Sequence, residues 1–178
     1  NIERKITDII SPGTVLDNYN NADTNYLVSV FISIYPQQYD KKIYVIGLSA
    51  IDVSTGQNTV HRIQSSVNDE NFWRDELFRL IHYYSPKEII FHFGEDITFT
   101  KEELCNLLVV DELMFHLNLY TDIQFKKPSF QNSFLGKIFQ SGALTAIEYL
   151  GFERELEITL SYIYMIQFVY EHKLENTM

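Results

Sequence analysis

Residues 26–93 follow an order of patterns that few folds allow: three strand-like stretches, an amphipathic helical stretch and a short apolar stretch. In residues 26–35, apolar side chains alternate with serines, as in a half-buried strand. Residues 43–53 and 58–64 have similar strand character, and the turn-forming sequence of residues 54–57 separates them. We therefore predict that the first three strands form an antiparallel meander.

The helical stretch that follows has a clear beginning and end. Asn68, Asp69 and Glu70 provide a cap and first-turn acids, and Ser85-Pro86 ends the helix. Residues 88–93 then form an apolar run of strand length, which is typical of a buried strand reached by a helical crossover. The expected order is β-β-β-α-β. The apolar stripe of the helix comprises Trp73, Leu77, Leu80, Ile81 and Tyr84.

The following stretch is less regular. Residues 100–110 have helical character, and residues 117–122 are predicted to form a final strand. Another helix begins at Lys127-Pro128-Ser129. Its apolar residues Phe130, Phe134 and Ile138 are expected to face inward, and its polar residues Gln131, Asn132 and Lys137 are expected to face water.

The character of the chain changes after Gly142. Residues 143–150 predict a short helix that ends at Gly151, and residues 153–173 predict one long helix that is apolar on nearly all sides. We expect its partners to lie outside this chain, so that a chain ending at residue 151 would behave better. We divide the chain into an incoming linker (1–24), an α/β domain (25–141) and the start of a helical segment (142–178).

The charge of the chain disfavours direct binding to nucleic acid. Its 24 acidic and 14 basic residues give a net charge of −10, which repels a phosphate backbone. No stretch reaches the roughly 20 apolar residues that a membrane span needs. We therefore expect a soluble protein. Because Cys105 is the single cysteine, we also expect no internal disulfide and an intracellular location. Because the chain does not begin with Met, we also expect it to be a segment of a longer protein.

The motifs of common catalytic sites are absent from the sequence. There is no P-loop, because the pair Gly136-Lys137 precedes Ile138 instead of Ser or Thr. The five histidines and one cysteine lack the spacing of a zinc site. We therefore expect no catalytic residue, cofactor or metal in this chain.

The predicted order of elements resembles that of RNase H-like sheets, whose nucleases hold two metal ions with carboxylates. Asp52, Glu95 and Asp96 are the candidates for such a site. An alternative role for Asp52 is structural, because a carboxylate beside Ser54, Thr55 and Gly56 commonly accepts hydrogen bonds from turn amides. We favour the structural role and keep the metal-dependent nuclease as the alternative function.

Three stretches resemble MutS-type DNA mismatch-repair ATPases. Residues 4–14 (RKITDIISPGT) are similar to the passage that leaves the mismatch-binding domain of that family. Residues 50–56 (AIDVSTG) are similar to the hairpin of its connector domain, although Gln57 stands where Glu is common. Residues 134–173 resemble the exit into the lever helices. The resemblance covers most of the chain, and it departs from the commonest bacterial form at the exit.

The resemblance implies a role as well as a fold. It implies an RNase H-like connector domain without catalytic machinery, in a parent that binds mismatched DNA as a homodimer or heterodimer and hydrolyses ATP with magnesium elsewhere in its chain. It also implies docking of a MutL-type partner on the exposed connector helix, at Gln131, Asn132 and Lys137. We therefore expect the double substitution Gln131→Ala, Asn132→Ala to weaken partner binding without changing stability.

Overall fold

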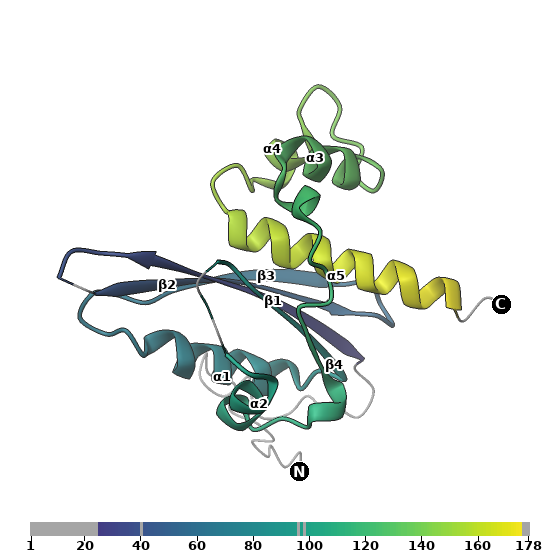
Figure 1. The fold of residues 1–178 in the computed structure, drawn as a ribbon. Coiled ribbons are helices and arrows are strands. Elements are labelled where there is room, and N and C mark those ends of the chain that lie inside the picture. The colour runs from purple at the N-terminus through teal and green to yellow at the C-terminus, as the bar shows by residue number, and fades with distance from the viewer. Residues whose placement is uncertain (1–24, 40, 96, 98, 176–178) are drawn as a thin grey trace, which may run out of the picture.

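In the computed structural model, which describes residues 25–39, 41–95, 97 and 99–175, a mixed sheet lies between two layers of helices (Figure 1). The strands and helices follow the order β1, β2, β3, α1, β4, α2, β5, α3, α4, α5. The predicted β-β-β-α-β succession is therefore confirmed. The leading residues 1–24, predicted as a linker, lie outside the described residues.

The sheet has five strands in the order β3-β2-β1-β4-β5. The first three strands form the predicted antiparallel meander, and β4 and β5 run parallel to β1. This arrangement makes the sheet mixed. The strands are β1 (Tyr26–Pro36), β2 (Lys42–Asp52), β3 (Asn58–Gln64), β4 (Glu88–Phe93) and β5 (Phe115–Leu117).

The last strand is not where the sequence predicted it. β5 covers Phe115–Leu117, and residues 118–122 are irregular. Asn118 ends the strand because it adopts a φ of 49°, its backbone N–H donates to the carbonyl of Phe91, and its side-chain oxygen accepts from the N–H of Phe93. The local pattern of apolar residues cannot predict such a side-chain hydrogen bond.

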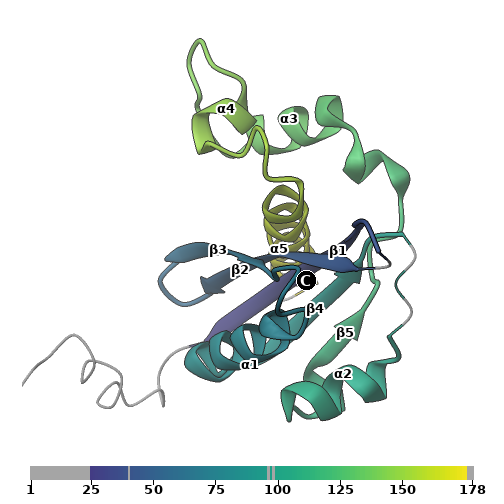
Figure 2. The same ribbon diagram turned by 90° about the vertical axis from the view of Figure 1, so that its left-hand side faces the viewer.

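Two helices cover one face of the sheet, α1 (Phe72–Tyr84) and α2 (Lys101–Leu108) (Figures 1 and 2). The predicted apolar stripe of α1 is buried, and Ser85 ends this helix in the left-handed conformation. Asp69 accepts a hydrogen bond from the N–H of Phe72, while the N-cap residue Asn71 makes no side-chain cap. Thr100 and Glu103 form a capping box that begins α2.

The opposite face is covered by α5 (Leu156–Glu175), which lies across β1 and β2 (Figure 1). Its side chains Leu160, Ile163 and Met165 are fully buried. The expectation that the partners of this helix lie outside the chain is therefore wrong for the residues described. The predicted division at residue 142 stays a prediction, and it falls between elements that pack on one another.

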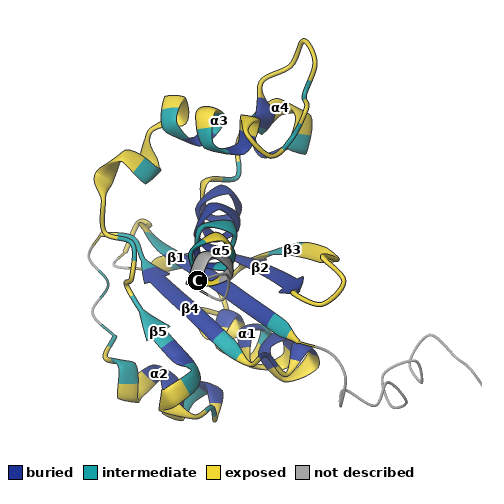
Figure 3. Cartoon of the chain, turned by 90° about the vertical axis from the view of Figure 1, so that its right-hand side faces the viewer, coloured by how far each residue is buried: buried dark blue, intermediate teal, exposed yellow. Residues whose placement is uncertain are grey.

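Two short helices, α3 (Pro128–Gly136) and α4 (Ala146–Leu150), lie on the far side of α5 from the sheet (Figure 1). They pack on each other, and Figure 3 shows that they are more exposed than α5 or the central strands β1 and β4. A 3-10 turn, η2 (Ile123–Lys126), leads into α3. Within this small helical layer, Gln131, Leu135 and Ala146 are the buried residues of α3 and α4.

Candidate functional site

A carboxylate-centred turn joins β2 to β3. Asp52 accepts hydrogen bonds from the backbone N–H of Ser54 (3.0 Å) and the hydroxyl of Thr55 (2.8 Å). The N–H of Gly56, which has a φ of 78°, donates to the Asp52 carbonyl at 2.7 Å. The Thr55 hydroxyl, followed by the amides of Ser54 and Asn25, lowers the pKa of Asp52. The geometry is that of the structural turn predicted for Asp52, Ser54, Thr55 and Gly56.

The proposed nuclease carboxylates lie at opposite ends of the sheet. Asp52 is paired with Tyr26 at the start of β1, whereas Glu95 follows β4 beyond the pair Ile32 and Phe93. Tyr26 and Ile32 are about 20 Å apart along an extended strand. Two-metal sites hold their ions about 4 Å apart, so Asp52 and Glu95 cannot share one.

Asp96, the third candidate, lies outside the described residues, and Glu95 is exposed beside Lys126 (3.5 Å). Among the described residues, no three His, Cys, Asp or Glu side chains are grouped so as to hold a metal ion. None of the helices in the described part of the chain is both long and apolar enough to span a membrane.

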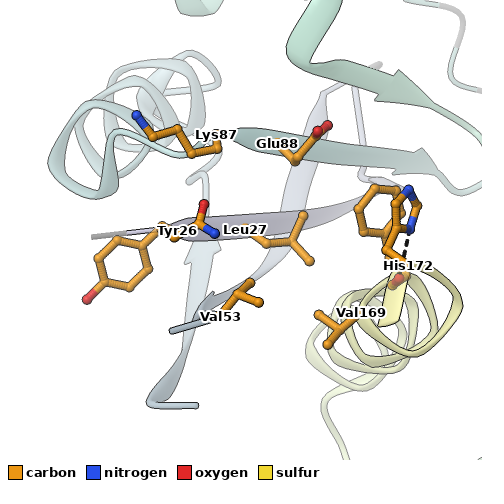
Figure 4. A pocket seen from close by; sticks show the side chains of 9 residues that line it. Tyr26, Leu27, Val53, Lys87, Glu88, Val169 and His172 are labelled. Carbon is orange, nitrogen blue, oxygen red and sulfur yellow. Dashed lines mark hydrogen bonds between the residues drawn. The ribbon is translucent and has the colours of Figure 1, made fainter. Parts of the chain in front are cut away.

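A hollow of about 290 Å³ lies where the folded unit joins its flanking sequence (Figure 4). Asn25, just before β1, and His172, near the end of α5, both line it. Figure 4 shows Lys87 on one side of the hollow and His172 on the other, with Leu27 between them. We call this region the junction hollow. It brings both ends of the described fold to the side of the sheet where β1 and β4 begin, which sequence patterns had not indicated.

The end of α5 is held in place at the junction hollow by ring and backbone contacts. The Phe168 ring stacks on the His172 ring at 3.9 Å, and Nδ1 of His172 is hydrogen-bonded to the Phe168 carbonyl. The ring of His116 also lies 5.3 Å from the Phe168 ring, and its Nε2 pairs with Glu88 at the start of β4. These contacts fasten the last turns of α5 to β4 and β5.

The predicted partner-contact residues of α3 do not all face water. Gln131 is only 3% exposed and donates to the carbonyl of Phe125 at 2.8 Å. Asn132, which is half-buried, accepts from the N–H of Ile147 at 3.1 Å. The expectation that these two amides are exposed is therefore wrong, because they satisfy backbone groups of η2 and α4. Lys137 is exposed as predicted.

The apolar face of α3 also differs from the prediction. Leu135 is its fully buried apolar residue, whereas Ile138 is 46% exposed. Phe130 and Phe134 are half-buried. Because Gln131 contributes to the buried face, the double substitution Gln131→Ala, Asn132→Ala would remove internal hydrogen bonds. It is therefore unsuitable as a surface variant, and the partner contact itself stays a prediction.

A groove of about 480 Å³ lies between α3 and α5, and we call it the α3–α5 groove. The sequence shows that the segment containing its α3 wall is basic. Residues 123–147 contain three lysines and no acidic residue, in a chain with a net charge of −10. The walls of the groove include Phe130 and Phe134 of α3, Lys137 and Ile138 in the turn that follows it, and Ile166 and Tyr170 of α5.

His92 on β4 is a buried histidine that the sequence did not single out. Its Nε2 accepts a hydrogen bond from the N–H of Tyr120 at 2.9 Å, so the proton of the neutral ring is on Nδ1. Among the described residues, Nδ1 has no partner. The rings of Tyr120 and Tyr164 lie at 5.6 Å and 4.1 Å from it. Burial lowers the pKa of His92 to about 3, which keeps the ring neutral near pH 7.

The geometry defines an α/β domain on a mixed five-stranded sheet, with no assembled metal or carboxylate cluster in the described residues. No protein-family model matches the chain. Comparison with known proteins nevertheless confirms the predicted resemblance: the chain is a homologue of a segment of MutS-type DNA mismatch-repair proteins.

Three relatives support this assignment. The chain is 32% identical, over 97% of its length, to a putative DNA mismatch repair protein mutS homolog of Acanthamoeba polyphaga mimivirus. It is 28% identical over 93% of its length to the DNA mismatch repair protein MutS of Clostridioides difficile, and 30% identical over 68% to that of Lactococcus lactis subsp. lactis. It spans only 17%, 15% and 13% of the lengths of these relatives.

Proposed function

We propose that this chain is the non-catalytic connector of a MutS-type mismatch-repair protein, which couples binding of mismatched DNA to ATP hydrolysis in other parts of the same protein. The observation that carries the proposal is the junction hollow, which both Asn25 and His172 line. A folded unit that is attached to its neighbours on one side can rotate as a rigid body about that attachment. Such a movement can transmit a change between two sites without any chemistry in the unit itself.

We further propose that the fold is RNase H-like. The support is the order β3-β2-β1-β4-β5, with an antiparallel meander followed by two strands parallel to β1. The alternative function, a metal-dependent nuclease, is disfavoured by the separation of Asp52 and Glu95 at opposite ends of the sheet. It predicts magnesium-dependent cleavage of nucleic acid by this chain, abolished by Glu95→Gln.

We propose that residues 142–178 are the start of a lever segment. The packing of α5 on the sheet limits how this segment can move. Because α5 covers β1 and β2, its buried part must move together with the sheet. Relative motion is then confined to the sequence that follows α5. The proposed coupling therefore runs from the sheet through α5.

The parent is proposed to bind ATP and magnesium outside this chain and to act as a homodimer or heterodimer. A MutL-type partner is proposed to dock on the α3 side of the connector. The supporting observations are the exposed outer residues of α3 and α4 (Figure 3) and the exposure of Lys137, which directly follows α3. Gln131 and Asn132 would support such a surface from inside.

The coupling proposal is tested in the full-length parent by a short Gly-Ser insertion between Thr24 and Asn25. The insertion loosens the attachment at the junction hollow, so mismatched DNA should stimulate ATP turnover several-fold less. Basal turnover and mismatch affinity should not change. The matched control places the same insertion after Gln38, in the exposed loop between β1 and β2. Unchanged stimulation with the insertion at Asn25 would refute the connector role.

A further inference from the structure

The α3–α5 groove has apolar walls that remain open to solvent. The rings of Phe130 and Phe134 stack with their centroids 6.0 Å apart on the α3 side. Ile138 is 46% exposed and Tyr170, on the α5 side, is 63% exposed. Large apolar side chains that gather around a hollow, instead of being scattered singly, are typical of a protein-binding surface.

The length of the groove matches a short helix. From Phe130 to Gly136 the helical part of this wall extends for about 9 Å, at about 1.5 Å per residue, and Lys137 and Ile138 continue it in a turn. Two turns of a helix laid along this wall would present apolar residues at positions i, i+3 or i+4, and i+7. A third helix packed against two existing ones also buries ridges in grooves, which is the common geometry of helix packing.

The charge of the groove favours an acidic occupant. Lys137 is exposed at the end of α3, and among the described residues it forms no ion pair. The acid nearest in sequence on the α5 wall, Glu171, accepts hydrogen bonds from Gln167 and Tyr120 and lines the neighbouring hollow. An acidic side chain of a partner would therefore complement Lys137. The apolar walls disfavour a phosphate backbone, which needs cations and polar donors.

We infer that the α3–α5 groove binds an acidic amphipathic helix of a partner protein, with the apolar side of that helix against Phe134, Ile138 and Tyr170 and a carboxylate beside Lys137. The inference rests on the proposed partner docking at α3 and specifies its chemistry. It moves the contact from the amides of Gln131 and Asn132 to the opposite face of α3. Specificity then comes from the charge of the helix, and affinity from its apolar residues.

The test uses two fluorescent helical peptides with identical apolar residues, one with glutamates and one with lysines on the polar face. Fluorescence anisotropy measures their binding to this chain and to its Lys137→Glu variant. The acidic peptide should bind the unmodified chain more tightly, and Lys137→Glu should weaken it by about tenfold. The basic peptide should gain affinity for Lys137→Glu, a reversal that loss of folding cannot produce. Lys41→Glu, an equal charge change in the β1–β2 hairpin, should change neither affinity.

Tyr170→Ser tests the apolar part, and it should weaken both peptides equally. Equal binding of the two peptides, or an acidic peptide unaffected by both groove substitutions, would overturn the inference. If duplex DNA displaces the acidic peptide and itself requires Lys137, the site binds nucleic acid and the inference is wrong. None of these measurements involves ATP turnover, so their failure leaves the connector proposal standing on its own insertion test.

Discussion

Gly47 of β2 lies directly against the backbone of Glu157 in α5. A Cβ on Gly47 would lie 2.1 Å from the Glu157 carbonyl oxygen and 2.4 Å from the nitrogen of Ile158, both well inside van der Waals contact. One turn further along the helix, the hydroxyls of Ser49 and Ser161 are 2.8 Å apart. Small residues on β2 thus allow α5 to approach the sheet closely enough to seal its face.

We predict that Gly47→Ala lowers the free energy of unfolding by about 2–3 kcal/mol, because the backbone of α5 must move away from β2. Urea unfolding followed by circular dichroism measures the change. Gly136→Ala is the matched control, since a Cβ at Gly136 meets no atom within 4 Å. It should stay within about 1 kcal/mol of the unmodified chain. Equal effects of the two substitutions would show that the close contact between Gly47 and the backbone of α5 does not determine the free energy of unfolding.

We predict that Asp52→Asn lowers the melting temperature at pH 7, because it weakens hydrogen bonds to the Asp52 carboxylate. The pKa of Asp52 is depressed in the folded state, chiefly by the Thr55 hydroxyl, so its stabilising effect is present above the unfolded pKa. That effect is lost as the pH falls through the folded pKa. The difference between variant and unmodified chain should therefore shrink in thermal melts as the pH falls below the ordinary aspartate pKa of about 3.9. Glu153→Gln, on an exposed residue, is the control.

We predict that His92 makes the fold sensitive to acid. Burial holds the pKa of His92 at about 3, whereas an unfolded histidine titrates near 6.5, so the unfolded state binds the extra proton between these values. Stability should fall as the pH decreases through this window, by up to ~1.4 kcal/mol per pH unit from this group. His92→Gln keeps an acceptor for the N–H of Tyr120 and should flatten the slope. Parallel pH profiles of the two proteins would contradict the assignment.

We predict that a chain ending at Gly151 does not retain the native sheet. The truncation removes Leu160, Ile163 and Met165, each worth roughly 1.5–3 kcal/mol of burial, against a typical net stability of about 5–15 kcal/mol. Circular dichroism should show loss of native signal, and sedimentation should show aggregation. Removal of residues 176–178 alone serves as the control. A monomer with native strand content after truncation at Gly151 would show that α5 is dispensable.

The patterns of the sequence predicted the local elements of the first half correctly. Strand β3 (Asn58–Gln64) and strand β4 (Glu88–Phe93) have the predicted bounds, and the predicted stripe of α1 is buried. These predictions are correct because each element buries one face, and the spacing of apolar residues on that face can be seen within a few consecutive residues. The Asp52 turn was predictable for the same reason, since its contacts with Ser54, Thr55 and Gly56 span only a few residues, whereas the contact with the amide of Asn25 was not.

Only the tertiary structure decided what the later helices contact. The sequence determined that a long helix, apolar on many sides, lies near residues 153–173, and the structure places it at Leu156–Glu175. The partner of that helix is a distant strand, which can approach closely because Gly47 has no side chain. The outward face of α3 was decided in the same way. Gln131 is buried, where it donates a hydrogen bond to the Phe125 carbonyl. The spacing of apolar residues does not predict such a hydrogen bond. The spacing of apolar residues predicts that one face of a helix or strand is buried, whereas contacts between residues distant in the sequence determine which element covers that face.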